Sequence, residues 1–246
     1  MPDTRCHRGA HPSDEQLFNA KQLLKLRVAT DDLSWLLSRG YSKPSALKLV
    51  GDRHQLHGRQ RMALGRSACS DQAVKARKAT CLPVDCIRGK DLLIDGFNLL
   101  ITIEAALAGG LLLLCRDGCV RDLASVHGSY RSVEETTQAI LLIGNTLEMH
   151  QPQSVEWLFD KPVSNSGKIT GLLRTTAESH DWPWTAQVVF NPDTEISHSP
   201  KIAISSDSSI LDHAARWVNF SRALLEHSVP RAWMINLQEK HVGSSI

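Results

Sequence analysis

Apolar residues recur at helical spacing in the first part of the chain. Leucines between residues 17 and 26 form an apolar stripe behind Ser13, which can cap a helix beginning at Asp14. Further helices are predicted over 31–39, over 43–50 and over about 55–67. Short helices joined by tight turns are typical of a helix-turn-helix-like unit, so we expect a small all-helical domain over 13–70. Residues 1–12 are polar and are expected to be disordered.

The pattern changes beyond residue 90, where short apolar runs alternate with longer segments at helical spacing. Strands are predicted over 91–94, 155–159, 187–190, 201–204 and 231–237, and helices over 96–108, 132–150, 166–179 and 208–227. This alternation predicts an α/β domain over 91–246 with a mostly parallel sheet. Residues 71–90 remain basic but lose clear periodicity, so a basic linker is expected there.

Charge divides the chain into two unlike parts. The net charge of the 246 residues is only +2. Residues 1–90, however, contain 17 Lys and Arg against 8 Asp and Glu, whereas residues 91–246 contain 11 against 18. The division suggests a basic part that faces nucleic acid and an acidic part suited to metal.

Cysteine usage and hydrophobicity indicate a cytoplasmic protein without a membrane partner. The six cysteines include no C-x-x-C pair, and no signal peptide precedes them, so we expect reduced thiols. The apolar stretch over 99–115 is shorter than a membrane span and contains Glu104 and a Gly-Gly pair. We interpret it as a helix, a turn and a strand of a soluble core. A homodimer is left open.

Aspartates follow three of the predicted strands. The strand over 91–94 is followed by Asp95, that over 155–159 by Asp160, and that over 201–204 by Asp207 after two serines. The carboxyl ends of parallel strands meet at one edge of a sheet, where ligands bind. Neighbouring carboxylates repel one another unless a cation neutralises them, and Mg²⁺ or Mn²⁺ takes such oxygen ligands.

Each aspartate also has a structural interpretation. Asp95 can belong to a turn with Gly96, Asp160 can begin a turn before Pro162, and Asp207 can cap a helix beginning at Ser208. Taken one at a time, these structural roles are favoured. Their occurrence after three strand ends favours a shared site.

The segments around these aspartates resemble a known superfamily. Leu93-Ile94-Asp95-Gly96-Phe97-Asn98 resembles the opening strand motif of the PIN-like superfamily, particularly its NYN branch of metal-dependent ribonucleases. Residues 157–160 and 204–212 are similar to later acidic segments of that branch. The resemblance implies a three-layer α/β fold, metal ligands at Asp95, Asp160 and Asp207, and Asn98 as a pocket residue.

Other acidic residues are weaker candidates for metal ligands at this site. The late loop of that branch often has a closely spaced acidic pair, whereas here Asp212 stands five residues after Asp207. PIN-like proteins often supply a helical Glu, for which Glu134 is the candidate, because Glu135 is expected to form a capping box with Ser132. Asp117 and Asp122 are expected to be surface residues of a strand–turn–strand segment over 115–123.

The basic helical part offers a nucleic-acid contact. Arg53, Arg59, Arg61 and Arg66 lie in a stretch without acidic residues, and a solvated helix face is the alternative interpretation. On a helix Arg59 and Arg66 share a face that Arg61 does not. Separately, 40–41, 49–53 and 59–61 resemble parts of an uncharacterised prokaryotic family, which adds no function.

These features predict a metal-dependent nuclease, most readily an endoribonuclease. Only the resemblance favours RNA over DNA, and it also makes Asp95, Asn98, Asp160 and Asp207 the expected catalytic residues. The alternative is a non-catalytic regulator that binds nucleic acid through a degenerate PIN-like domain. A phosphatase of the haloacid dehalogenase type is disfavoured because Phe97 stands where a second Asp is required.

Overall fold

The computed structural model describes residues 7–124 and 130–238. The N-terminal helices are α1 (Asp14–Leu17), α2 (Ala20–Ser38), α3 (Lys43–Arg53) and α4 (Gly58–Ser67). The boundaries of the first two differ from the expected ones. Asn19 accepts a hydrogen bond from the Gln22 amide and starts a new helix, and no glycine or proline interrupts that helix before Ser38. The helix expected over 31–39 is therefore the second half of α2.

The segment expected to be a linker, 71–90, is folded instead. It contains α5 (Asp71–Thr80), the short strand β1 (Cys81–Leu82) and a 3-10 turn over Val84–Ile87. Ser70 caps α5 by accepting a hydrogen bond from the Ala73 amide. The residue that α5 buries is Arg77, so its inward face is charged rather than apolar and gives no hydrophobic period.

A parallel sheet dominates the second part of the chain, as predicted. In the described residues its strand order is β1-β8-β7-β2-β5-β6. The strands beyond β1 are β2 (Asp91–Asp95), β5 (Ser154–Asp160), β6 (Trp184–Val189), β7 (Ile202–Ile204) and β8 (Trp217–Val218). Every neighbouring pair is parallel.

Helices cover both faces of this sheet, which makes three layers. They are α6 (Gly96–Leu107), α7 (Thr136–His150), α8 (Ser166–Ser179), α9 (Pro192–Ser197), α10 (Ser208–Leu211) and α11 (Phe220–Ser228). Alternate residues of β2 enter different cores: Leu92 and Ile94 pack with the residues of α6 and α7, whereas Leu93 packs with those of α9 and α10. The α/β class and its layers are thus confirmed.

The single helix expected over 208–227 is wrong. The chain forms α10, then β8, then α11, because Trp217 and Val218 are fully buried as an additional strand of the sheet. The strand expected over 231–237 exists as β9 (Met234–Asn236). It joins a separate sheet of order β4-β3-β9 in the described residues, with β3 (Leu112–Leu114) and β4 (Val120–Asp122).

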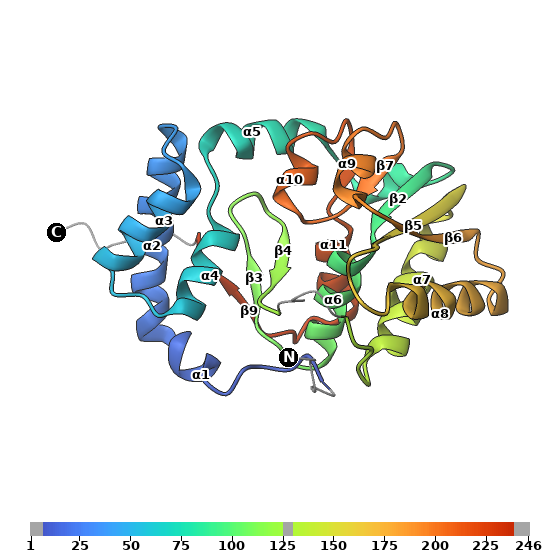
Figure 1. Ribbon diagram of the computed structural model, residues 1–246, viewed down its shortest axis with the longest axis horizontal. Coiled ribbons are helices and arrows are strands. Elements are labelled where there is room, and N and C mark those ends of the chain that lie inside the picture. Colours follow the sequence, from blue (N-terminus) through green and yellow to red (C-terminus); the bar gives the residue numbers. More distant parts are fainter. Residues whose placement is uncertain (1–6, 125–129, 239–246) are drawn as a thin grey trace.

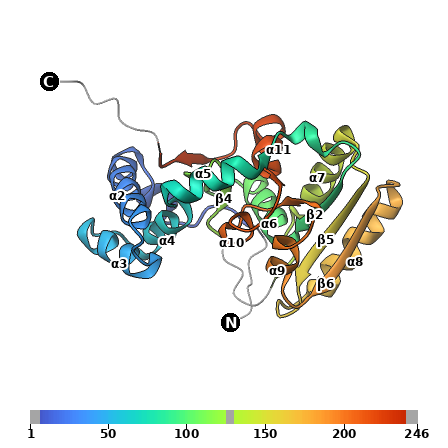
Figure 2. The same cartoon turned by 90° about the horizontal axis from the view of Figure 1, so that it is seen from above.

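This small sheet connects the helical part to the parallel sheet. Figure 1 shows β3, β4 and β9 between helices α2–α4 and the strands β2, β5 and β6, and Figure 2 shows β4 in this position from above. Leu113 of β3 and Ile235 of β9 share a hydrophobic core with Leu26 of α2 and Leu64 of α4. The helical part is therefore built into the same body as the sheet.

The chain segment before α1 is anchored where disorder was expected. Arg8 is 5% exposed and forms an ion pair with the fully buried Glu104 of α6. The same carboxylate accepts a 2.6 Å hydrogen bond from the hydroxyl of Tyr130. The expectation of disorder is wrong for residues 7–12, and residues 1–6 lie outside the described residues.

The apolar stretch over 99–115 lies inside the fold, in α6 and β3. Among the described residues, no helix is both long and apolar enough to cross a membrane. The described cysteines, which exclude Cys6, are all free thiols.

Candidate functional site

The strands that carry the aspartates are neighbours, which is the condition for these side chains to share one site. Strand β2 pairs with β5 on one side and with β7 on the other. Asp95 lies opposite Leu158, so Asp160 stands only two residues further along the adjacent strand. Because β7 is in register with β2 at Ile204 and Ile94, Ser205 and Asp207 follow at the same edge. The parallel register therefore gathers these aspartates.

A cavity of about 440 Å³ opens at this edge, and we call it the acidic cavity. Its lining includes Asp95, Asp160 and Asp207 together with Asn98, as the sequence led us to expect. It also includes Asp193, the second residue of α9, which sequence reasoning missed. We call the set Asp95, Asp160, Asp193 and Asp207 the strand-end aspartates, because each lies at or just after the end of one of four adjacent strands, β2, β5, β6 and β7.

Asp95 is the most buried strand-end aspartate, at 6% exposed. Burial raises the pKa of its carboxyl group to about 7, and the negative charges of Asp207, Asp193 and Asp160 contribute to the rise. A 2.8 Å hydrogen bond from the Ser205 hydroxyl to Oδ2 opposes it. The charged form of Asp95 is therefore unfavourable near neutral pH, and a nearby cation would stabilise it.

The other members of the set differ in their surroundings. Burial raises the pKa of Asp160, and both burial and the charges of Asp207 and Asp160 raise that of Asp193. Asp207 has the capping role that was considered for it, since its Oδ1 accepts a 2.7 Å hydrogen bond from the Ser209 amide. One oxygen of Asp207 thus holds the loop, while the residue also lines the acidic cavity.

Asn98 connects α6 to the loop after β7. Its Oδ1 accepts hydrogen bonds from the Ser206 amide at 2.8 Å and from the Ser206 hydroxyl at 2.9 Å. The backbone amide must donate, so the acceptor is fixed as the oxygen and the side-chain NH₂ is the remaining group. That NH₂ donates to no other described residue. Asn98 therefore positions the Asp207 loop and keeps a donor for the cavity.

Cationic side chains line another part of the same cavity. They are Lys43 of α3, Arg66 of α4 and Arg121 of β4, and we call them the cationic wall. Arg121 is buried and donates to the Ser206 carbonyl oxygen at 2.7 Å. Its pKa stays well above the ordinary value: burial opposes the positive charge, but the negative charges around it, Asp117 among them, more than offset burial. The cavity thus presents both charge signs to a ligand.

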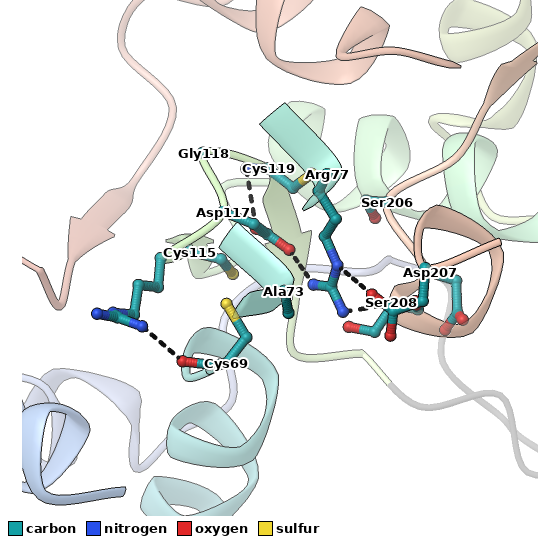
Figure 3. A network of polar contacts seen from close by, with 12 residues as sticks. Cys69, Ala73, Arg77, Cys115, Asp117, Gly118, Cys119, Ser206, Asp207 and Ser208 are labelled. Atoms are coloured by element: carbon teal, nitrogen blue, oxygen red, sulfur yellow. Dashed lines mark hydrogen bonds and ion pairs between the residues drawn. The ribbon is translucent and has the colours of Figure 1, made fainter. Parts of the chain in front are cut away.

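Asp117 is not the surface turn residue that was expected. Its side chain is fully buried, bound by Arg121 Nη2 at 2.7 Å and by Arg77 Nη1 at 2.5 Å. Burial by itself would raise the pKa of Asp117, but these two guanidinium groups outweigh it and lower the pKa. Figure 3 shows Arg77 reaching from α5 between Asp117 and the loop at Ser208. The network fixes the loop that carries Asp207.

Two more acidic residues have positions that differ from the expectation. Asp212 binds Arg77 Nε at 2.7 Å and is absent from the lining of the acidic cavity, so it belongs to the network rather than to the strand-end aspartates. Asp122, expected at the surface, is 7% exposed and lines the cavity. Its Oδ2 accepts from the Thr102 hydroxyl at 3.2 Å.

The expected capping box at the start of α7 is wrong. Glu135 occupies the N-cap position without a capping hydrogen bond from its side chain, and the Val133 amide donates instead to the Thr136 hydroxyl at 2.9 Å. Glu134 is exposed and lies 3.5 Å from His7 Nε2, away from the acidic cavity. Neither glutamate lines the site.

The four arginines expected to bind nucleic acid are largely used within the fold. Arg59 forms an ion pair with the fully buried Asp14 and donates to the Leu123 carbonyl oxygen at 3.3 Å. Arg66 donates to the Ala124 carbonyl oxygen at 3.0 Å. The shared face of Arg59 and Arg66 therefore packs along the end of β4.

The remaining two arginines differ in exposure. Arg61 donates to the Leu56 carbonyl oxygen at 2.9 Å and pairs with Asp52 at 2.8 Å. Arg53 keeps an exposed side chain, 3.7 Å from Asp32. Of the four arginines, Arg66 is the one that lines the acidic cavity, so the structure does not gather them on one surface of it.

The acidic cavity fits a hydrated divalent ion better than an enclosed one. Among the described residues, no three His, Cys, Asp or Glu side chains come close enough to enclose a metal ion. Mg²⁺ commonly binds through one or two carboxylates and keeps several water ligands. The residues that could hold it are the strand-end aspartates, because their carboxylate oxygens line one part of the same cavity. The metal itself stays a prediction.

A larger cavity, of about 930 Å³, lies along α8 and β6. Its lining includes Arg174, Trp182 and Trp184, and Arg174 donates to the Ala186 carbonyl oxygen of the edge strand at 3.0 Å. Strand-end aspartates are absent from its lining. We therefore take the acidic cavity as the candidate functional site, because charged side chains gather in it, although the other cavity is larger.

Comparison with known proteins relates the chain to two families. The model of a domain of unknown function (DUF5616) matches residues 84–223, and that of a protein of unknown function (DUF434) matches residues 25–79. The chain is 31% identical over 188 residues to the uncharacterized protein MJ0935 of Methanocaldococcus jannaschii, a match that covers 76% of this chain and 89% of the relative. No solved structure matches significantly. The acidic cavity takes residues from both matched segments.

Proposed function

The chain belongs to the DUF5616 family, and we propose that its acidic cavity binds Mg²⁺ or Mn²⁺ and hydrolyses phosphodiester bonds of RNA. The observation that carries the proposal is that aspartates following four adjacent parallel strands line one cavity. Metal-dependent hydrolysis needs such a cluster of oxygen ligands. The choice of RNA over DNA rests on the resemblance of residues 93–98, 157–160 and 204–212 to the NYN branch of the PIN-like superfamily.

The side chains in the cavity have distinct roles under this proposal. A bound divalent cation would supply positive charge to the scissile phosphate and make a water molecule more acidic. Asp95 would have to be deprotonated to hold the cation, and because its pKa is raised to about 7 a part of the molecules carries a proton there at neutral pH. The Ser205 hydroxyl holds Oδ2 of Asp95 in place at 2.8 Å. The NH₂ group of Asn98 is available to orient water or a phosphate oxygen.

Hydrogen bonds hold the loop after β7, which carries Asp207, in place at the cavity. The Asp207 carboxylate must keep one orientation although it lies in a loop. Ser206 is bound by Asn98 through its amide and by Arg121 through its carbonyl oxygen, at 2.8 and 2.7 Å. Both contacts therefore come from residues of regular elements, Asn98 of α6 and Arg121 of β4.

A matched pair of variants in α9 tests the proposal. Asp193 lines the cavity, whereas Glu195, two residues later in the same helical turn, is exposed and absent from its lining. With Mn²⁺ and a labelled single-stranded RNA, Asp193→Asn is expected to lower kcat about 10²-fold, the usual effect of losing one electrostatic group. Glu195→Gln should cleave like the wild type.

The outcomes separate the nuclease from its rivals. Cleavage that needs a divalent ion and Asp193 supports the proposal. Equal activity of the two variants, or activity that survives chelation by EDTA, would contradict it. RNA binding by a wild-type protein that never cleaves would favour the non-catalytic regulator instead.

A further inference from the structure

We infer that Lys43 binds a phosphate group of the substrate, so that the N-terminal helical part completes the site. The inference rests on the proposed function and extends it. Lys43 is the first residue of α3 and lines the acidic cavity with Asp207 and Arg121. It belongs to the segment matched by DUF434, whereas the strand-end aspartates belong to the segment matched by DUF5616.

The cationic wall contains one charge that the fold does not use. Arg121 is held by Asp117 and by the Ser206 carbonyl oxygen. Arg66 is held by the Ala124 carbonyl oxygen and lies 3.3 Å from Asp122 Oδ1. The ammonium group of Lys43 forms neither a hydrogen bond nor an ion pair with any described residue. Its ammonium group is therefore the member of the wall that remains free for a ligand.

The surroundings of Lys43 favour an anion. Lys43 is exposed to solvent as a residue, but the protein atoms crowded around its ammonium group lower its pKa, the positive charges of Arg121 and Arg77 lower it further, and Asp207 raises it. A cation repelled by two guanidinium groups gains more from a bound anion than an isolated surface lysine does. This is the counterpart of Asp95, whose carboxylate is repelled by other carboxylates and gains from a bound cation.

A phosphodiester accompanied by a divalent cation supplies both the anion that Lys43 favours and the cation that Asp95 favours. The strand-end aspartates offer oxygen ligands for the cation, and Lys43 offers a positive charge for the phosphate. The shared hydrophobic core of Leu26, Leu64, Leu113 and Ile235 holds the helical part against the small sheet, so the position of Lys43 does not depend on a loose linker. The substrate class that follows is a phosphate-rich polyanion such as single-stranded RNA.

A binding measurement on the full chain tests this inference. Lys48 is the matched control because it lies on the same helix, is 79% exposed in its side chain, and pairs with Asp52. Fluorescence anisotropy of a labelled single-stranded RNA with Ca²⁺ in place of Mn²⁺, in samples checked by gel for intact RNA, follows binding with a divalent cation present. Lys43→Ala is expected to weaken binding about tenfold at low salt and to lower the salt slope by about 0.7, the value for one phosphate contact on a single strand. Lys43→Arg should bind like the wild type.

The possible results separate the inference from the proposed function. Equal affinity and slope for Lys43→Ala and Lys48→Ala would overturn the inference, and so would a wild type that does not bind RNA. If Lys43 governs binding but no divalent ion supports cleavage, the inference stands and the nuclease proposal fails. If the wild type cleaves RNA and Lys43→Ala binds and cleaves equally well, the nuclease proposal stands and the inference fails.

Discussion

Replacing Asp95 with asparagine removes a charge that the fold tolerates poorly. Asp95 is 6% exposed, and burial together with Asp207, Asp193 and Asp160 raises its pKa from 3.8 to about 7. The asparagine keeps an oxygen that can accept the hydrogen bond from the Ser205 hydroxyl. The substitution therefore removes the charge while it preserves shape and the main contact.

The size and sign of the effect follow from linkage. One pKa unit corresponds to 1.36 kcal/mol, so a pKa of about 7 in place of 3.8 corresponds to about 4 kcal/mol. Between these two pH values the folded state holds a proton at Asp95 that the unfolded state has lost. The wild type thus loses this stability as pH rises from about 4 to about 7, and the loss is complete above pH 7.

Urea unfolding in EDTA, measured from pH 4 to pH 8, checks the prediction. The free energy of unfolding of Asp95→Asn should match that of the wild type near pH 4 and exceed it by up to about 4 kcal/mol at pH 8. Mn²⁺ should then narrow the difference at pH 8, by about 2.7 kcal/mol at one hundred times Kd, because the wild type gains binding energy that the variant lacks. A difference between the two proteins that does not change with pH would refute the reasoning.

Other substitutions test the ion pairs that hold the structure. Arg59→Ala leaves the fully buried Asp14 without its partner and should lower the free energy of unfolding by about 3–5 kcal/mol in urea, with RNA affinity unchanged; a large loss of affinity in a folded variant would contradict the structural role. Asp117→Asn should destabilise the protein by a similar amount at pH 7, because it releases Arg77 and Arg121. Since the pKa of Asp117 is lowered, that difference should shrink as pH falls below about 4, and a difference that persists at pH 2 would count against it.

The sequence predicted β2, β5 and β7 and the aspartates after them because both follow from short-range pattern. Each of these three strands is a compact apolar run, and an aspartate stands at its end or close behind it. The same pattern did not predict Asp193, for two reasons. Asp193 follows β6 by four residues, after Asn191 and Pro192, and the strand itself alternates between buried and exposed positions. Extending the search to the first turn of the next helix would have found it.

Features that depend on contacts between distant segments could not be predicted. Helix α5 buries Arg77, which has meaning only through Asp117, forty residues away, and Asp212. A charged residue on a short basic segment gives no apolar period, so the segment looked like a linker. Likewise, the arginine-rich stretch had no acidic residue in its own sequence, yet Arg59 is paired with Asp14 of another helix.

Diffraction from crystals grown with Mn²⁺ tests the central claim most directly, since anomalous scattering locates the ion independently of any assay. The account predicts a peak in the acidic cavity, at about 2.1 Å from a carboxylate oxygen of at least one strand-end aspartate. It also predicts that the peak disappears in crystals of Asp95→Asn. An empty acidic cavity at saturating Mn²⁺, or an ion bound only elsewhere on the protein, would contradict the account.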